Sequence, residues 1–318
     1  MIVRRLLRRL LHTILLLIVV SAVWFALLAA SPGDYFDLQR LDPRVSPETI
    51  QKLRVDYGLN KTWPIRYLDW LRSVTHGDMR VSIVYNQPVT QLLLPRVANT
   101  LLLTVAGTLL AWAFAIPAGL WAGVKQNTSI DRLFTLVAAV LIAIPELLLG
   151  ILLVYWVATN THWPVGGMHS TRTNSFTDVL QHLLLPAIVL AAGLFPVLFQ
   201  HLRTSVAEAS SAPFVRSAKS LGIPPHRIWL RYVLPVAANP MISLLGLSIG
   251  GLWSSSLLIE VIFGWPGLGP LFVEAVMAKD TYLVLTPVIC SAVVLAIGNL
   301  LADLFLLWND PRIRTTAA

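Results

Sequence analysis

The chain has 318 residues, of which 56% are hydrophobic and only 13% are charged, and its mean hydropathy is +0.71. A soluble core of this size does not need so much apolar surface, so the composition predicts a polytopic membrane protein. The net charge of +8 does not indicate nucleic-acid binding, because the basic residues lie in short stretches between apolar segments, which is the arrangement that orients membrane proteins. The one cysteine, Cys290, excludes an internal disulfide.

The N-terminal segment, residues 1–30, has a basic start, MIVRRLLRRLLH, followed by an apolar run over 13–30. Two interpretations compete, a cleaved signal peptide and an uncleaved first transmembrane helix. The run is long for a signal core and further apolar segments follow it, so we favour the uncleaved helix.

Residues 31–98 are more polar and predict a small extracytoplasmic helical subdomain. Ser46 and Pro47 are typical of a helix start, and Gly58 of its end. A second helix is expected from near Pro64 to Gly77. We favour a packing role for this subdomain over a ligand-binding one.

The remaining chain holds five more apolar segments, each long enough to cross about 30 Å of hydrocarbon. With the first helix they give six transmembrane helices in an all-α fold, and a tail follows at 309–318. Prolines within or at the ends of these segments predict kinks, because neighbouring helices in a bundle can satisfy the carbonyls that proline frees. The five segments lie at 99–123, 133–158, 180–202, 238–262 and 285–308.

The basic residues of the short connections predict the orientation. Those of the N-terminus, of the turn at 124–132, of the 203–235 segment and of the tail all fall on one side, whereas the short loops of the other side offer only Arg172 and Lys279. Both termini and the 203–235 segment are therefore expected in the cytoplasm.

No catalytic, cofactor or metal residues are expected. The chain has no G-x-x-x-x-G-K-[ST] loop for phosphates and no H-E-x-x-H metal motif, and its histidines are loosely placed. The glycine-rich GWPGLG at 264–269 lacks a lysine and predicts a turn.

Three acidic residues lie in or near the apolar segments, where an unpaired charge at the bilayer centre costs about 2.5 to 3.5 kcal/mol. Glu146, Glu260 and Asp303 are therefore expected to face the bundle interior or a watery cavity, as candidates for a substrate pathway or gate. Pairing with a neighbouring helix is the alternative. For Asp303 we favour this pairing, and for Glu146 both interpretations stay open. Glu260 lies near the end of its helix, so simple hydration is a further alternative for it.

The 203–235 segment is too polar to cross a bilayer. It carries five basic residues against the single Glu208, yet its apolar residues recur at helical spacing. Gly222, Pro224 and Pro225 divide it into two helical parts. This pattern predicts a short helix-turn-helix that a partner protein binds. A loop that only sets the membrane topology would need neither the helix end at Gly222 nor the second helix after the two prolines.

Segments along almost the whole chain resemble the permease subunits of the dipeptide/oligopeptide/nickel class of binding-protein-dependent ABC importers. Their order and spacing together are specific. They include GLNKTWPIRYLDWL, RVANTLLLT, IPAGLWAG, SIDR, AIPELLLGILLVY, WPVGGM, FVRSAKSLGIPPHRIWLRYVLP, EVIFGWPGLGPLFVEAV and NDPRIR.

In that family the cytoplasmic loop carries a glutamate-alanine-alanine motif with a glycine four residues after the second alanine. Setting Gly222 on this glycine places Arg216 where glutamate is usual, and peptide-type members are similar in having a basic version. The resemblance implies that the segment couples the chain to ATPases. If its first helix inserts into a groove of the partner, the spacing makes Phe214 and Leu221 the expected apolar anchors, and Arg216 and Lys219 the partner-facing charges. The expected coupling residues are Phe214, Arg216, Ser217, Ala218, Lys219, Leu221, Gly222 and Pro235.

The resemblance also implies the function, an ATP-driven importer of di- or oligopeptides in the bacterial inner membrane. The implied partners are a second homologous permease, two ATP-binding subunits, an extracytoplasmic solute-binding protein and the lipid bilayer. An importer of nickel or another non-peptide substrate is the nearest alternative. An integral membrane enzyme is a more distant one, because no titratable pair is spaced to converge.

Overall fold

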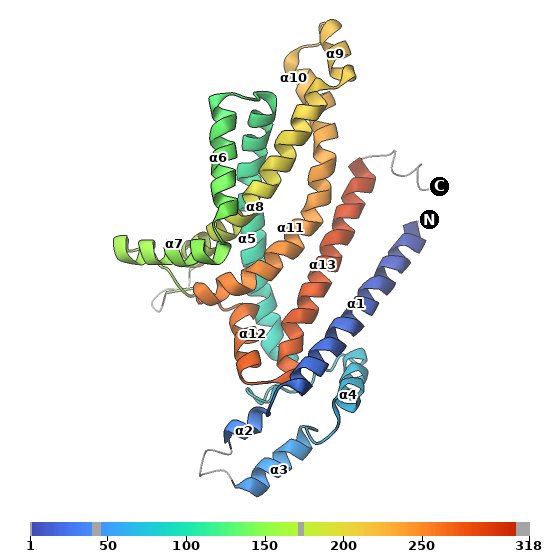
Figure 1. Ribbon diagram of the computed structural model, residues 1–318, viewed down its shortest axis with the longest axis vertical. Coiled ribbons are helices and arrows are strands. Elements are labelled where there is room, and N and C mark those ends of the chain that lie inside the picture. The colour runs from blue at the N-terminus through green and yellow to red at the C-terminus, as the bar shows by residue number, and fades with distance from the viewer. Residues whose placement is uncertain (1, 40–45, 171–174, 310–318) are drawn as a thin grey trace. The chain divides into compact units, whose positions relative to one another are not determined.

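The computed structural model describes residues 2–39, 46–170 and 175–309, and every regular element in these ranges is helical. The predicted all-α membrane fold is confirmed (Figure 1). A π-helical turn, Trp229–Val233, joins two of the helices. The α-helices are α1 (Ile2–Ala30), α2 (Tyr35–Gln39), α3 (Pro47–Asp56), α4 (Trp63–Thr75), α5 (Val89–Val124), α6 (Ser129–Ala143), α7 (Glu146–Asn160), α8 (Phe176–Ser211), α9 (Pro213–Ser220), α10 (Pro225–Ile228), α11 (Leu234–Ile262), α12 (Leu268–Met277) and α13 (Thr281–Asn309).

Four helices in the described ranges, α1, α5, α8 and α13, are long and apolar enough to cross a membrane. The helix α11 covers the expected segment at 238–262, and its 29 residues extend for about 44 Å at 1.5 Å per residue. The apolar segment expected over 133–158 with a kink at Pro145 is divided into two helices, α6 and α7, which are bent by 98° at the break. Ile144, the residue before Pro145, is extended, as the proline ring requires, and this ends α6.

The chain forms two compact units, and the first comprises Thr100–Trp265 with the chain from Val294 onward. Its core lies where α5 packs on α8 through small residues. A Cβ added at Gly119 would lie 2.9 Å from that of Leu202, and one added at Gly123 would lie 2.7 Å from that of Val206. Small residues let two helix backbones approach closely, which is how membrane helices associate without a hydrophobic driving force between them.

The second unit comprises Ile2–Asn99 with Pro266–Val293 and has an aromatic centre. Phe25, Tyr67 and Trp70 are buried against one another, and the Tyr67 hydroxyl donates to the carbonyl of Ile18 at 2.9 Å. Both helices predicted for the outer segment are confirmed as α3 and α4. Ser46 caps α3, its Oγ accepting from the amide of Thr49 at 3.2 Å.

The turn between α12 and α13 is fixed to the 82–84 loop of the same unit by Asp280, which is fully buried. Its Oδ2 accepts from Ser82 Oγ at 2.6 Å and from the amides of Ile83 and Val84 at 2.7 and 3.1 Å. Its Oδ1 accepts from the amide of Leu283 at 3.2 Å. The helix α12 was not among the sequence predictions.

Candidate functional site

The polar segment 203–235 begins as a direct continuation of α8, which runs on to Ser211. Only Ala212 separates α8 from α9, and its extended backbone (φ −63°, ψ 149°) ends one helix and starts the next. Pro213 takes the first position of α9, where a missing amide hydrogen costs nothing. Figure 1 shows α9 and α10 together at one end of α8 and α11.

The end of α9 is built on Gly222, as the sequence predicted. Gly222 has φ +72°, its amide bonds to the carbonyl of Lys219 at 3.0 Å, and the amide of Ile223 bonds back to Ala218 at 3.2 Å. This is a Schellman end, which satisfies helix carbonyls through a residue in the left-handed conformation. Nothing lies within 4 Å of a Cβ added at Gly222, so the backbone angle alone requires glycine.

The helix α9 has two distinct faces. Val215 and Ala218 are 1% and 3% exposed and join the core of the unit beside Val206 of α8. Phe214 and Leu221 are 40% and 79% exposed. The polar side chains Arg216, Ser217 and Lys219 are also exposed, so Ala218 is the one expected coupling residue of α9 that faces the protein's own core.

The chain returns to α11 through α10 and the π-helical turn Trp229–Val233. Pro235, an exposed residue in the first turn of α11, has no amide hydrogen to donate to the carbonyl of Arg231 four residues earlier. The amide of Leu234, the residue before this proline, bonds to the carbonyl of Trp229, which is five residues earlier and not four as in an α-helix. Pi-helical turns of this kind are frequent at functional sites.

An ion pair joins α8 to the start of α6 within the same unit. Arg203 approaches Asp131 with Nε at 2.5 Å from Oδ1 and Nη2 at 2.8 Å from Oδ2. Asp131 is 2% exposed and also accepts from the amide of Asn127 at 2.8 Å. Arg203 is thus not a free basic residue of the loop, as its place in the sequence suggested, but a fixed contact between two helices.

Glu146 occupies the first position of α7, immediately after the break at Pro145. Its carboxyl carbon lies 3.1 Å from the position that a Cβ on Gly193 of α8 would take, and Ser255 of α11 lies beside it. Its Oε1 is buried, with no hydrogen-bond partner among the described residues. Glu146 therefore sits where three helices meet, as expected for a residue facing the bundle interior.

The other two acidic candidates differ from Glu146. Glu260 is 0% exposed in α11, so the interpretation that it is simply hydrated is wrong. Asp303 belongs to α13, but its side chain lies outside the described residues. No group of three His, Cys, Asp or Glu side chains that could hold a metal ion occurs in the described ranges.

Known proteins match this chain along nearly its full length. The model of the binding-protein-dependent transport system inner membrane component matches residues 115–315, and the N-terminal model of the same systems matches residues 2–104. The oligopeptide transport system permease protein AppB of Bacillus subtilis is 33% identical, over 96% of this chain and 98% of that protein. The dipeptide transport system permease protein DppB of Escherichia coli is 30% identical, over 97% and 98%.

A solved structure of the MetNI methionine ABC transporter in inward-facing conformations matches with a TM-score of 0.57 at 15% identity, covering 70% of this chain and 97% of that one. At this identity the match supports the fold alone. The family models and the two permease proteins are the evidence for the family of the chain. The chain belongs to the family of binding-protein-dependent transport system inner membrane components, the multi-pass permease subunits of ABC importers.

Proposed function

We propose that this permease imports di- or oligopeptides. We also propose that α9 contacts an ATP-binding subunit and transmits its ATP-driven movement to the membrane helices. The substrate class rests on the named relatives, which are permeases of an oligopeptide and a dipeptide transport system. The coupling role rests on one observation: Val215 and Ala218 of α9 are buried in the protein's own core, while Phe214 in its first turn and Leu221 just after its end are exposed.

The exposed face suits a helix-in-groove contact. Phe214 and Leu221 are seven residues apart, two helical turns, so they project from one side as a pair of apolar anchors. Arg216 and Lys219, on the other side of the helix, are also exposed and give α9 a positive charge. Because the 203–235 segment is too polar to enter the bilayer, its exposed apolar side chains suit a protein partner.

The buried face makes α9 a rigid lever. Val215 and Ala218 lock α9 against α8, and Ala212 is the only residue between the two helices. A displacement of α9 is therefore expected to move α8 and α11 as a body, in the manner of rigid-body transitions between packed states. Glu146, Glu260 and Asp303 are the proposed pathway or gate residues that such a motion would rearrange.

The proposed assembly contains a second homologous permease, two ATP-binding subunits and an extracytoplasmic solute-binding protein. The basic residues of the short connections support a cytoplasmic position for both termini and for α9. In this arrangement 31–98 forms the outer subdomain, 99–308 the permease core, 203–235 the coupling segment and 309–318 the tail.

The test replaces the two anchors together, Phe214→Ala with Leu221→Ala, in the full chain expressed with its partner subunits. We expect the chain to insert into the membrane normally, the ATP-binding subunits to be lost on purification, and peptide uptake to fall to background. The control is Leu109→Ala, which shortens a 65% exposed side chain of α5 and leaves both readouts unchanged. Retention of the ATP-binding subunits and uptake by the double variant would overturn the coupling role.

A further inference from the structure

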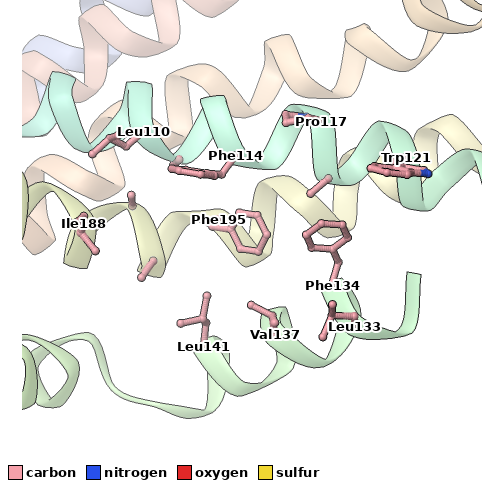
Figure 2. Close-up of a pocket in the computed structure, with 14 residues that line it drawn as sticks. Leu110, Phe114, Pro117, Trp121, Leu133, Phe134, Val137, Leu141, Ile188 and Phe195 are labelled. Atoms are coloured by element: carbon pink, nitrogen blue, oxygen red, sulfur yellow. The ribbon is translucent and has the colours of Figure 1, made fainter. Parts of the chain in front are cut away.

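A long apolar groove runs between α5 and α6, with α8 as its floor. Its volume is about 570 Å³, and all 14 residues that line it are apolar. Figure 2 shows side chains of all three helices converging on this space, with Leu110 and Ile188 toward one end and Trp121 at the other. Several of the lining side chains are exposed, Phe114 and Leu133 by 64% and 57%, so the groove opens sideways.

The length of the groove matches one leaflet of a bilayer. From Leu110 to Trp121 the helix α5 rises about 16 Å at 1.5 Å per residue. Half of a hydrocarbon core of about 30 Å is about 15 Å. An acyl chain that enters beside Trp121 would therefore reach the bilayer centre near Leu110.

The Trp121 end of the groove is basic. Lys125 directly follows the last residue of α5, one turn beyond Trp121, and its Nζ lies 5.7 Å from the centre of the Trp121 ring. Arg132 immediately precedes Leu133 of the lining, and both basic side chains are exposed. Neither forms an ion pair with a carboxylate within the described part of the chain. Tryptophan at the membrane interface and basic residues just beyond it are the surroundings that an anionic lipid headgroup prefers.

Small residues line much of the groove and keep it narrow. Alanines form much of the floor while aromatic and branched side chains form the rims, which gives a narrow slot. This shape suits a flexible hydrocarbon chain.

We propose that the groove between α5, α6 and α8 binds an anionic phospholipid, with an acyl chain in the groove and the phosphate headgroup at Lys125 and Arg132. This inference depends on membrane insertion and not on the transported substrate. A lipid wedged between α6 and α8 would stabilise the arrangement of the helices that carry the Asp131–Arg203 pair. The lipid would then be a structural ligand of the permease.

The test is native mass spectrometry of the full chain, purified in detergent with the subunits that accompany it, stripped of lipid and then titrated. The probes are phosphatidylglycerol and phosphatidylcholine with identical acyl chains. We expect phosphatidylglycerol to bind the wild type more tightly. Lys125→Gln should weaken phosphatidylglycerol binding about fivefold, and Lys125→Gln with Arg132→Gln about 25-fold, with phosphatidylcholine unchanged.

The matched control is Lys52→Gln, which removes an exposed lysine of α3 and should change neither lipid's affinity. Ala192→Leu fills the groove from its floor and should weaken both lipids. Equal binding of the two lipids by the wild type, or unchanged phosphatidylglycerol affinity in Lys125→Gln, would overturn the proposal. Cross-linking of Val137→Cys to a helix of another subunit in native membranes would also overturn it, because a protein would then occupy the groove. The Lys125→Gln comparison decides the question even where Ala192→Leu fails to fold.

Discussion

Arg203 and Asp131 form a two-pronged ion pair, at 2.5 and 2.8 Å, that ties α8 to the first turn of α6. Arg203 lies eight residues before the end of α8, and α9 follows after Ala212 alone. The pair therefore joins the helix that carries the coupling segment to the helix that leads to Glu146. The two parallel hydrogen bonds of a guanidinium–carboxylate pair fix the relative orientation of the two groups, so the contact holds the two helices together.

Arg203→Ala should destabilise the chain more than Asp131→Asn does. The first change leaves a carboxylate that is 2% exposed without its partner, whereas the second removes the charge itself. Arg203 is 30% exposed, so we expect a loss of about 2 kcal/mol, between the values for surface and buried pairs. The measurement is thermal unfolding in detergent, with Arg227→Ala, a change at an exposed arginine of α10, as the control. Equal losses from the two single changes would contradict the expected extra cost of the unpaired, buried carboxylate.

Asp280→Ala should release the 82–84 loop from the α12–α13 turn. The change removes the acceptor of four hydrogen bonds at a fully buried position, so we expect a loss of about 3 kcal/mol or more. Limited proteolysis should then cut the 81–88 loop in the variant faster than in the wild type. Asp69→Ala is the control, since its partner Lys61 is exposed. Unchanged protease resistance in Asp280→Ala would contradict the assignment.

Glu146→Met should raise the melting temperature or leave it unchanged, while it lowers transport at least tenfold. A buried carboxylate oxygen with no hydrogen-bond partner among the described residues costs folding free energy, and an apolar replacement of similar length removes that cost. Uptake and unfolding are measured on the same preparations, with Leu147→Met, a 42% exposed neighbour, as the control. A destabilised variant with normal uptake would assign Glu146 a purely structural role.

The ionisation of Tyr85 should weaken the second unit at alkaline pH. Burial, and then the hydrogen bond that its hydroxyl donates to Glu274, raise the pKa of Tyr85 above its ordinary value of 10.0. Because the folded pKa is the higher one, this contribution to stability is complete below pH 10 and is lost as pH rises through the folded pKa. The difference in alkaline unfolding between wild type and Tyr85→Phe measures it. Identical pH profiles for the two proteins would contradict the raised pKa.

The sequence predicted the parts of the fold that follow from composition and local signals. The apolar segments, the cap at Ser46 and the stop at Gly222 depend on residues close together in the chain, and the structure has them where they were expected. The 98° break at Pro145 was expected as a kink, because proline shows where a helix is weakened but not how far the next one turns.

Contacts distant in sequence could not be predicted in this way. Arg203 and Asp131 are 72 residues apart, and Ser82 and Asp280 are 198 apart, so no periodicity connects them. The burial of Ala218 could not be predicted either, because a small residue suits a partner's groove and the protein's own core equally well. The helix α12 was overlooked because its ten residues, though mostly apolar, are too few to cross a membrane.

Cysteine cross-linking of α9 to the ATP-binding subunit tests the central claim most directly. Cys290 is the only cysteine of the chain, so Cys290→Ser provides a clean background. The account predicts that Leu221→Cys, at a position 79% exposed, cross-links to an ATP-binding subunit in membrane vesicles and that ATP changes the yield, while Ala218→Cys, at a position 3% exposed, does not react. Labelling of Leu221→Cys by an impermeant maleimide from outside the cell would contradict the account. Equal labelling with and without the ATP-binding subunits would also contradict it.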